Sequence, residues 1–215
     1  LGSKLLFNGN LCFPTVPLKQ YQPDLDKKLE NFNQYFSIHP ETEFYIYYIE
    51  KDTDINFETQ EVIPISDYIF EHAALPKSHM AAFEINSFAE FQDRFYKTDH
   101  HWNYKGSYQA YQEVLKLLGC DEPPLTPINT VEITDSFVGS KAAGMDSIFQ
   151  ETFSAYAFSF PSMTVFLNGK SADDYGNMTA FLDRSRQDVS YGEFYGDDAG
   201  EIIWIPVMWK KRIFY

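Results

Sequence analysis

The residues best suited to chemistry are Asp99, His100, His101 and Trp102, which are consecutive in a chain that has five histidines in all. In an extended backbone, a carboxylate two positions before a histidine can orient the imidazole ring and stabilise its protonated form. Such a histidine can take the proton of a hydroxyl nucleophile, which is weakly reactive on its own. We therefore interpret His101 as a general base, Asp99 as the residue that orients it, and expect a serine from elsewhere to complete the site.

The residue types alone allow two other interpretations of this motif, a metal site and a helix cap. Adjacent histidines point about 100° apart on a helix and to opposite faces on a strand, so both rarely bind one ion. No other histidine stands at a spacing typical of a metal site, so we expect no bound metal. The remaining alternative is that Asp99 caps a helix and neighbouring groups satisfy the two histidines.

Two helices are predicted to hold the motif. Residues 104–118 give the clearest helical pattern, with Tyr104, Tyr108 and Tyr111 on one stripe and Gly119 at the end. Before the motif, residues 87–95 predict a helix that begins with a capping box, with Ser87 at the N-cap and Glu90 three positions later. The motif should therefore lie on a loop that leads into a helix N-terminus.

The rest of the first half has the rhythm of an α/β protein. A helix is predicted over 23–36, with Pro23 in its first turn, and a buried strand over 42–51 that suits a parallel sheet. A further helix is predicted over 66–74, with Ser66 as its cap. These patterns indicate an α/β half over residues 20–120.

A proline-rich connection over 121–130 separates this half from a β-richer half over 131–215. Short alternating segments predict strands over 131–139, 153–160, 163–170 and 201–207, and the Asn168-Gly169 pair is typical of a hairpin turn. Loops rich in tyrosine, glycine and acidic residues occupy 173–181 and 190–200. We interpret residues 1–215 as one domain, incomplete at both ends.

Composition excludes several classes of protein. The formal net charge of −14 would repel a nucleic-acid backbone, and no basic patch offsets it. No run of 18 apolar residues is present, so we expect no membrane-spanning segment in this chain. Cys12 and Cys120 are the only cysteines, so they form one disulfide or two buried thiols, and a cysteine zinc site is excluded.

The motif also belongs to a longer pattern. Residues 95–115, FYKTDHHWNYKGSYQAYQEVL, resemble the signature of DHHW-family proteins, YYxTDHHWTxxGAxxAY, over about twenty consecutive positions. SFVGS at 136–140 and YGEFYGDDAGEI at 191–202 resemble two further segments of the family. These proteins are relatives of the SGNH-hydrolase-like proteins of alginate acetylation. The resemblance covers the chain from about residue 20 to 205.

The resemblance implies an SGNH-hydrolase-like three-layer α/β/α sandwich with a Ser-His-Asp triad and an additional β-rich segment in the second half. By position, Asp99 matches the acid, His101 the base and Trp102 an aromatic residue that packs the loop, while His100 falls on a variable position. The family's Gly-Asp-Ser turn is absent, and we expect the nucleophilic serine to follow Tyr215. Ser136 is the alternative nucleophile, and Ser140 could line the site.

The activity that the resemblance implies is O-acetyl transfer to, or acetyl-ester hydrolysis on, an extracellular or cell-envelope polysaccharide, without a cofactor or metal. The expected partners are a carbohydrate polymer, an acetyl donor and envelope polysaccharide-assembly proteins, and the protein would be exported. The alternative function is a polysaccharide-binding or assembly module that lacks the nucleophilic serine.

Overall fold

The structure is a computed structural model that describes residues 4–143, 149–158, 163–167, 170–171 and 202–206. It divides into two compact units, Leu1–Pro124 and Leu125–Tyr215. The boundary falls inside the proline-rich connection that the sequence indicated.

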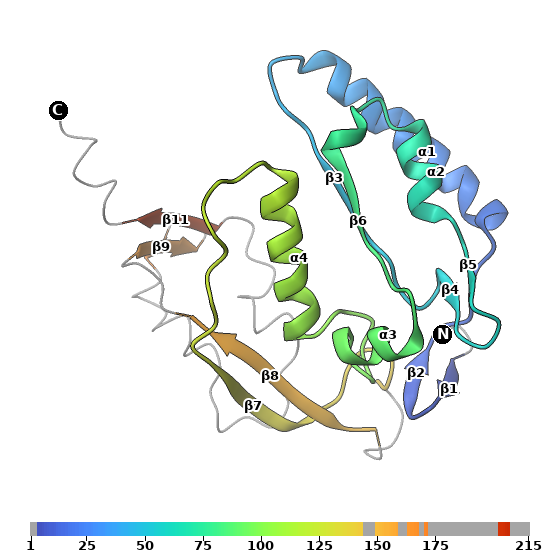
Figure 1. The fold of residues 1–215 in the computed structure, drawn as a ribbon, viewed down its shortest axis with the longest axis vertical. Coiled ribbons are helices and arrows are strands. Elements are labelled where there is room, and N and C mark those ends of the chain that lie inside the picture. The colour runs from blue at the N-terminus through green and yellow to red at the C-terminus, as the bar shows by residue number, and fades with distance from the viewer. Residues whose placement is uncertain (1–3, 144–148, 159–162, 168–169, 172–201, 207–215) are drawn as a thin grey trace. The chain divides into compact units, whose positions relative to one another are not determined.

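The first unit carries all the helices of the described residues (Figure 1). In chain order its elements are β1 (Leu5–Phe7), β2 (Asn10–Cys12), α1 (Leu18–Ile38), β3 (Ile46–Ile49), β4 (Ile55–Asn56), β5 (Glu61–Val62), α2 (Ile65–His72), the 3-10 helix η1 (Lys77–His79), β6 (Met80–Phe83), α3 (Phe88–Arg94) and α4 (Tyr104–Leu117). β1 pairs with β2 and β4 with β5, both antiparallel.

The parallel pair β3–β6 is the centre of this unit, with Ile46 opposite Met80 and Ile49 opposite Phe83. Side chains alternate between the two faces of a strand. Ile46 and Tyr48 therefore pack on one face, against the cluster formed by α1 and α2. On the other face, Tyr47 joins a second cluster with residues of α3 and α4. Helices thus cover both faces of the two strands (Figure 1).

The two clusters contain most of the buried apolar residues described in the first unit. The cluster on the α1–α2 side consists of Leu29, Ile65 and Ile69. The cluster on the α3–α4 side consists of Cys12, Ile55, Phe57, Phe83, Ile85, Phe91, Phe95 and Ala110, with Phe7, Tyr47, Phe88 and Trp102 packed against it. Aromatic rings pack against one another on this side, as in the pairs Phe57–Phe91 and Phe91–Phe95.

Most predicted elements of this unit are present, with shifted ends. α1 begins at Leu18, five residues before the predicted start, and Pro23 lies inside the helix. α2 begins after Pro64, so Ser66 is not its cap. The predicted strand over 42–51 is shorter, as β3, and its side chains are half-buried to exposed rather than buried. Its parallel pairing is confirmed.

The second unit contains β7 (Asn129–Phe137), β8 (Glu151–Ala157), β9 (Met163–Leu167), β10 (Lys170–Ser171) and β11 (Ile202–Pro206). β7 and β8 pair antiparallel with two register irregularities, and the rings of Phe137 and Phe153 lie 5.0 Å apart. β9 lies between β10 and β11 in an antiparallel sheet. The Asn168-Gly169 turn and the loops at 173–181 and 190–200 fall outside the described residues.

The described residues therefore form a mixed α/β protein with small sheets, which confirms the predicted class. The complete SGNH-type sandwich stays a prediction. No helix among these residues is long and apolar enough to cross a membrane. No disulfide joins Cys12 and Cys120, and Cys12 is buried whereas Cys120 is exposed. Cys120 is thus not one of two buried thiols.

Candidate active site

The motif lies on a short loop that is closed at its base. Phe95 and Trp102 form an isolated antiparallel bridge between the end of α3 and the start of α4. Inside this bridge, the backbone N–H of Tyr96 donates to the carbonyl of His101 at 3.2 Å. Outside it, the backbone N–H of Asn103 donates to the carbonyl of Arg94 at 2.7 Å. These bonds join the two ends of the loop that carries Asp99. The predicted loop before a helix N-terminus is confirmed, because α4 begins at Tyr104.

Asn103 holds the two helices to this loop. Its side-chain oxygen accepts hydrogen bonds from the backbone N–H groups of Lys105 and Gly106, so Asn103 is the N-cap of α4. Its amide nitrogen donates to the carbonyl of Asp93 in α3 at 2.8 Å. The alternative in which Asp99 caps the helix is therefore wrong.

Trp102 anchors the loop to the core. Its ring meets the ring of Phe83 edge-on, with centroids 5.6 Å apart. Phe83 is fully buried and ends β6, so the loop is fixed at the carboxyl end of a parallel strand. Ligand sites of open α/β sheets lie at this end of the strands. On another side, the backbone N–H of Leu11 in β2 donates to the carbonyl of Lys97 at 2.9 Å.

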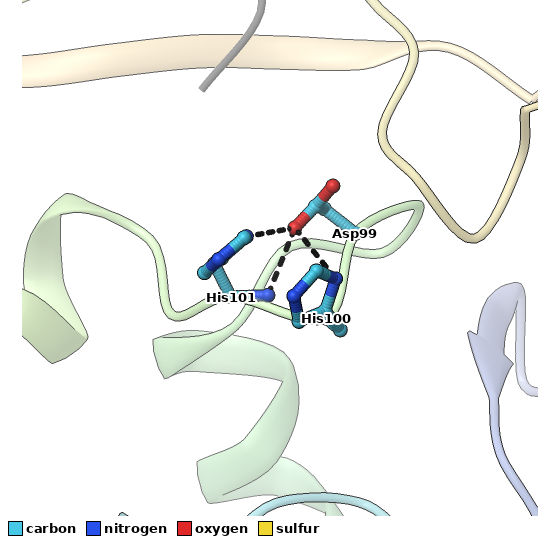
Figure 2. A group of neighbouring side chains, drawn as sticks. All are labelled: Asp99, His100 and His101. Carbon is cyan, nitrogen blue, oxygen red and sulfur yellow. Dashed lines mark hydrogen bonds and ion pairs between the residues drawn. The ribbon is translucent and has the colours of Figure 1, made fainter. Parts of the chain in front are cut away.

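Asp99 and His101 are joined by two hydrogen bonds (Figure 2). The Oδ1 atom of Asp99 accepts the backbone N–H of His101 at 2.9 Å. The same oxygen lies 2.5 Å from the Nδ1 atom of the His101 ring. A carboxylate is an acceptor, so this contact places the proton of the neutral ring on Nδ1 and leaves Nε2 as the acceptor.

Burial differs sharply between the two partners. The Asp99 side chain is 5% exposed, whereas the His101 side chain is 38% exposed. The acid is thus fixed within the protein while the ring it orients remains accessible to solvent. An imidazole held in this way has the geometry of a general base, because a buried acceptor fixes its tautomer and its direction.

His100 also turns toward the carboxylate, which the sequence analysis did not predict. Its Nδ1 atom lies 3.6 Å from Oδ1 of Asp99, and the two imidazole centroids are 3.8 Å apart (Figure 2). The loop is neither helix nor strand, so the argument that adjacent histidines point apart does not hold here. Asp99, His100 and His101 each offer a ligand atom within 4.8 Å of the others, which is compatible with a metal ion.

The two predicted serines belong to the second unit, whereas Asp99 and His101 belong to the first. Ser136 lies near the end of β7, and its hydroxyl is 3.0 Å from the hydroxyl of Thr134. Ser140 follows β7 and is exposed. The role of either serine stays a prediction.

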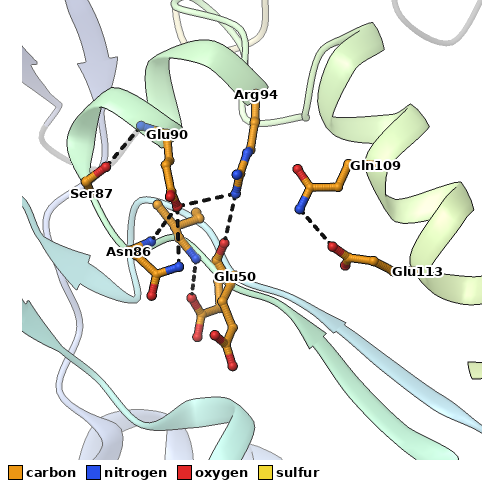
Figure 3. A network of polar contacts seen from close by, with 9 residues as sticks. Glu50, Asn86, Ser87, Glu90, Arg94, Gln109 and Glu113 are labelled. Carbon is orange, nitrogen blue, oxygen red and sulfur yellow. Dashed lines mark hydrogen bonds and ion pairs between the residues drawn. The ribbon is translucent and has the colours of Figure 1, made fainter. Parts of the chain in front are cut away.

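α3 is held in place by a polar network that was not predicted from the sequence (Figure 3). Arg94 donates to Glu90 and to the carbonyl of Glu84, both at 3.3 Å, and its guanidinium lies over the ring of Phe83. Glu90 also accepts the backbone N–H of Asn86 at 3.0 Å. These contacts fix the end of α3, from which the loop departs. The i,i+4 spacing of Glu90 and Arg94 was the available signal.

Buried Glu50 lies beside this network. Its carboxylate accepts the backbone N–H of Ile85 at 2.8 Å (Figure 3). Burial raises the pKa of Glu50, and the charges of Glu84 and Asp54 add to the rise, while the bond from Ile85 opposes it. The Glu50 side chain thus connects the end of β3 to the segment between β6 and α3.

The chain is similar to solved structures of known proteins. No protein-family model and no curated protein matches the chain. Among solved structures, Bacillus cereus PatB1 matches with a TM-score of 0.64 and 18% identity, over 97% of this chain and 77% of that one. PatB1 with a sulfonyl adduct matches with a TM-score of 0.60 and 16% identity, over 95% and 75% of the two chains.

A DHHW family protein from Eubacterium siraeum DSM 15702 also matches, with a TM-score of 0.50 and 14% identity, over 81% of this chain and 63% of that one. At these identities the likeness establishes a shared fold. The resemblance to DHHW-family proteins that the sequence indicated is thereby confirmed at the level of the fold.

Proposed function

We propose that this chain carries the base and the acid of an SGNH-hydrolase-like enzyme that transfers or hydrolyses acetyl groups on a polysaccharide. The single observation that supports this most is the 2.5 Å contact between Nδ1 of the accessible His101 ring and the buried Asp99 carboxylate. This contact directs Nε2 of His101 to act as the proton acceptor.

In the proposed reaction, Nε2 of His101 takes the proton of a serine hydroxyl as its oxygen attacks the acetyl carbonyl. The resulting oxyanion collapses, the donor's leaving group departs, and the protonated His101 returns the proton to that group. An acceptor hydroxyl then attacks the acetyl-serine as His101 removes its proton; the bond between the serine oxygen and the acetyl carbon breaks, and His101 returns that proton to the serine oxygen. A sugar hydroxyl makes the enzyme a transferase, and water makes it an esterase. Asp99 stabilises the imidazolium in both steps.

The comparisons support a nucleophile of this kind. One of the two PatB1 structures carries a sulfonyl adduct. Such an adduct forms when an activated nucleophilic side chain attacks a sulfonyl group, which is the reactivity that a base such as His101 confers on a serine. The fold is shared with this chain, and we extend the reactivity to it as a proposal.

The substrate class rests on the sequence resemblance to the alginate-acetylation proteins. We propose a carbohydrate polymer of the cell envelope or extracellular space as the acceptor, an acetyl donor as the second substrate and envelope polysaccharide-assembly proteins as partners. The protein would accordingly act outside the cytoplasm.

The test is covalent labelling of the full-length protein with a fluorophosphonate probe, followed by identification of the labelled peptide by mass spectrometry. We expect one labelled serine, with labelling lost in His101→Ala and retained in His72→Ala. His72 is an exposed histidine of α2 whose ring bonds to the carbonyl of Tyr68, so its replacement controls for loss of a histidine as such. No labelled serine, or equal labelling of both variants, would contradict the enzymatic proposal and favour the polysaccharide-binding alternative.

A further inference from the structure

We propose that Asp99, His100 and His101 together bind one divalent transition-metal ion of the Zn²⁺ type, and that the bound ion inhibits the proposed reaction. The observation behind this is the convergence of three ligand atoms on one point of the loop. Both imidazole rings turn toward the same carboxylate oxygen, and the three ligand atoms lie within 4.8 Å of one another (Figure 2).

The spacing suits a tetrahedral ion after small adjustments. With Zn–N and Zn–O bonds of about 2.1 Å, neighbouring ligand atoms of a tetrahedral site lie about 3.4 Å apart. The Asp99 oxygen is 3.6 Å from Nδ1 of His100 and 2.5 Å from Nδ1 of His101. Separating the second pair by about one ångström would accommodate the ion. Rotation of the His101 ring, which is 38% exposed, provides that movement.

The donor set selects the kind of ion. Two imidazoles and one carboxylate suit Zn²⁺, Cu²⁺ or Ni²⁺, whereas Mg²⁺ and Ca²⁺ require a larger set of oxygen ligands. The half-exposed rings provide access from solvent, and the buried carboxylate supplies the negative charge that favours a cation. Three protein ligands leave one tetrahedral position for water.

Binding would displace the hydrogen bond on which the proposed mechanism depends. The ion takes the position of the proton between Nδ1 of His101 and Asp99, so the neutral ring then carries its proton on Nε2. With that proton in place, Nε2 has no lone pair with which to accept the proton of a hydroxyl. This inhibitory effect rests on the proposed function, whereas the binding itself does not.

Isothermal titration calorimetry with ZnCl₂ tests the binding. We expect one Zn²⁺ per chain, with affinity lowered about tenfold or more in His100→Ala and in His101→Ala, because even outer-shell changes at metal sites cost 10- to 100-fold. His39→Ala is the matched control, since His39 is a partly exposed histidine outside the loop, and it should bind like the unmodified protein. MgCl₂ should give no comparable heat.

Circular dichroism of each variant establishes that it is folded before the titrations are compared. Absence of Zn²⁺ binding by the unmodified protein, or an equal affinity in His100→Ala and His39→Ala, would overturn the site. The visible ligand-field absorption of Co²⁺ gives a second readout, because tetrahedral coordination by the loop should be lost in His100→Ala.

Ester hydrolysis tests the inhibitory part. With each rate expressed as a fraction of the same variant's metal-free rate, the Zn²⁺ inhibition curve of His100→Ala should shift by the same factor as its affinity. Saturation of the site without inhibition would overturn this part. A protein without esterase activity would contradict the proposed function. The metal site would still be tested in that case, because calorimetry measures binding without turnover.

Discussion

Gly106, in the first turn of α4, lies against the backbone carbonyl of Arg94, the last residue of α3. A Cβ atom at position 106 would overlap that oxygen and lie 2.9 Å from the Cβ of Trp102. The oxygen belongs to the backbone and cannot move aside as a flexible side chain can. A glycine at this position is therefore what allows α4 to start so close to the motif loop.

Gly106→Ala should lower the free energy of unfolding by about 1–3 kcal/mol, as overpacking does. Within a helix, alanine is otherwise favoured over glycine by about 1 kcal/mol, so a loss of stability would report the steric contact rather than helix propensity. Ser107→Ala is the control, because the Ser107 hydroxyl donates to the Tyr104 carbonyl of its own helix. Urea denaturation measures both variants, and a stabilised Gly106→Ala would contradict the contact.

Asn103→Ala should cost more than the removal of an ordinary cap. An N-cap side chain is worth about 1 kcal/mol, and Asn103 also donates to the carbonyl of Asp93. Asn103→Asp keeps the capping oxygen but loses this donor, so it should fall between Asn103→Ala and the unmodified protein. The urea midpoints of the three proteins give this order.

Ser87→Ala is the comparison for this effect. Ser87 caps α3 by accepting the backbone N–H of Glu90, at 3.2 Å. The Ser87→Ala variant should lose only the ordinary capping contribution to the free energy of unfolding, about 1 kcal/mol. Equal losses in Ser87→Ala and Asn103→Ala would mean that the bond from Asn103 to α3 adds nothing to stability.

Asp99→Asn should leave the fold intact and lower kcat for p-nitrophenyl acetate by roughly 10⁴-fold, as an equivalent change does in a serine-protease triad. Oδ1 of Asp99 meets both the backbone N–H and Nδ1 of His101, so an asparagine oxygen there keeps both contacts but no longer carries the charge that stabilises the imidazolium. With the amide turned the other way, its N–H faces Nδ1 and selects the wrong ring tautomer. Steady-state kinetics with and without the change test this, with His72→Ala as control. Unaltered kcat would remove Asp99 from the proposed mechanism.

Local signals allowed much of the site's framework to be predicted. The predicted helix over 104–118 matches α4, and the capping contact between Ser87 and Glu90 is present at the start of α3. Both features depend on residues that are close together in the sequence, which is why they could be predicted from it. The parallel pairing of β3 was also predicted, from its apolar composition.

The features that were not predicted depend on longer-range or irregular structure. Pro23 read as the start of a helix, but the helix extends five residues further because Leu18 and Tyr21 pack against the α1–α2 cluster. The convergence of His100 and His101 arises in a turn whose backbone has neither the helical nor the extended period, so spacing rules gave the wrong answer there. The short strand β6 was missed since MAAF has no β-branched residue.

Glu50 should make stability depend on pH in the direction opposite to that of an ion-paired acid. Burial raises its pKa, so the folded protein holds the proton more tightly than the unfolded chain does. Its contribution to stability is therefore complete below the ordinary glutamate pKa, near pH 4, and is lost as the pH rises through the raised pKa. Asp54, whose pKa burial also raises, acts in the same direction.

Glu50→Gln removes the charge while its side-chain oxygen can still accept the backbone N–H of Ile85. We expect the variant to have a higher urea midpoint than the unmodified protein at about pH 7, and the two midpoints to converge near pH 4. Glu61→Gln, at an exposed position of β5, should show no such divergence. If the urea midpoints of Glu50→Gln and the unmodified protein instead differ by the same amount at every pH in this range, ionisation of Glu50 does not lower the stability of the fold.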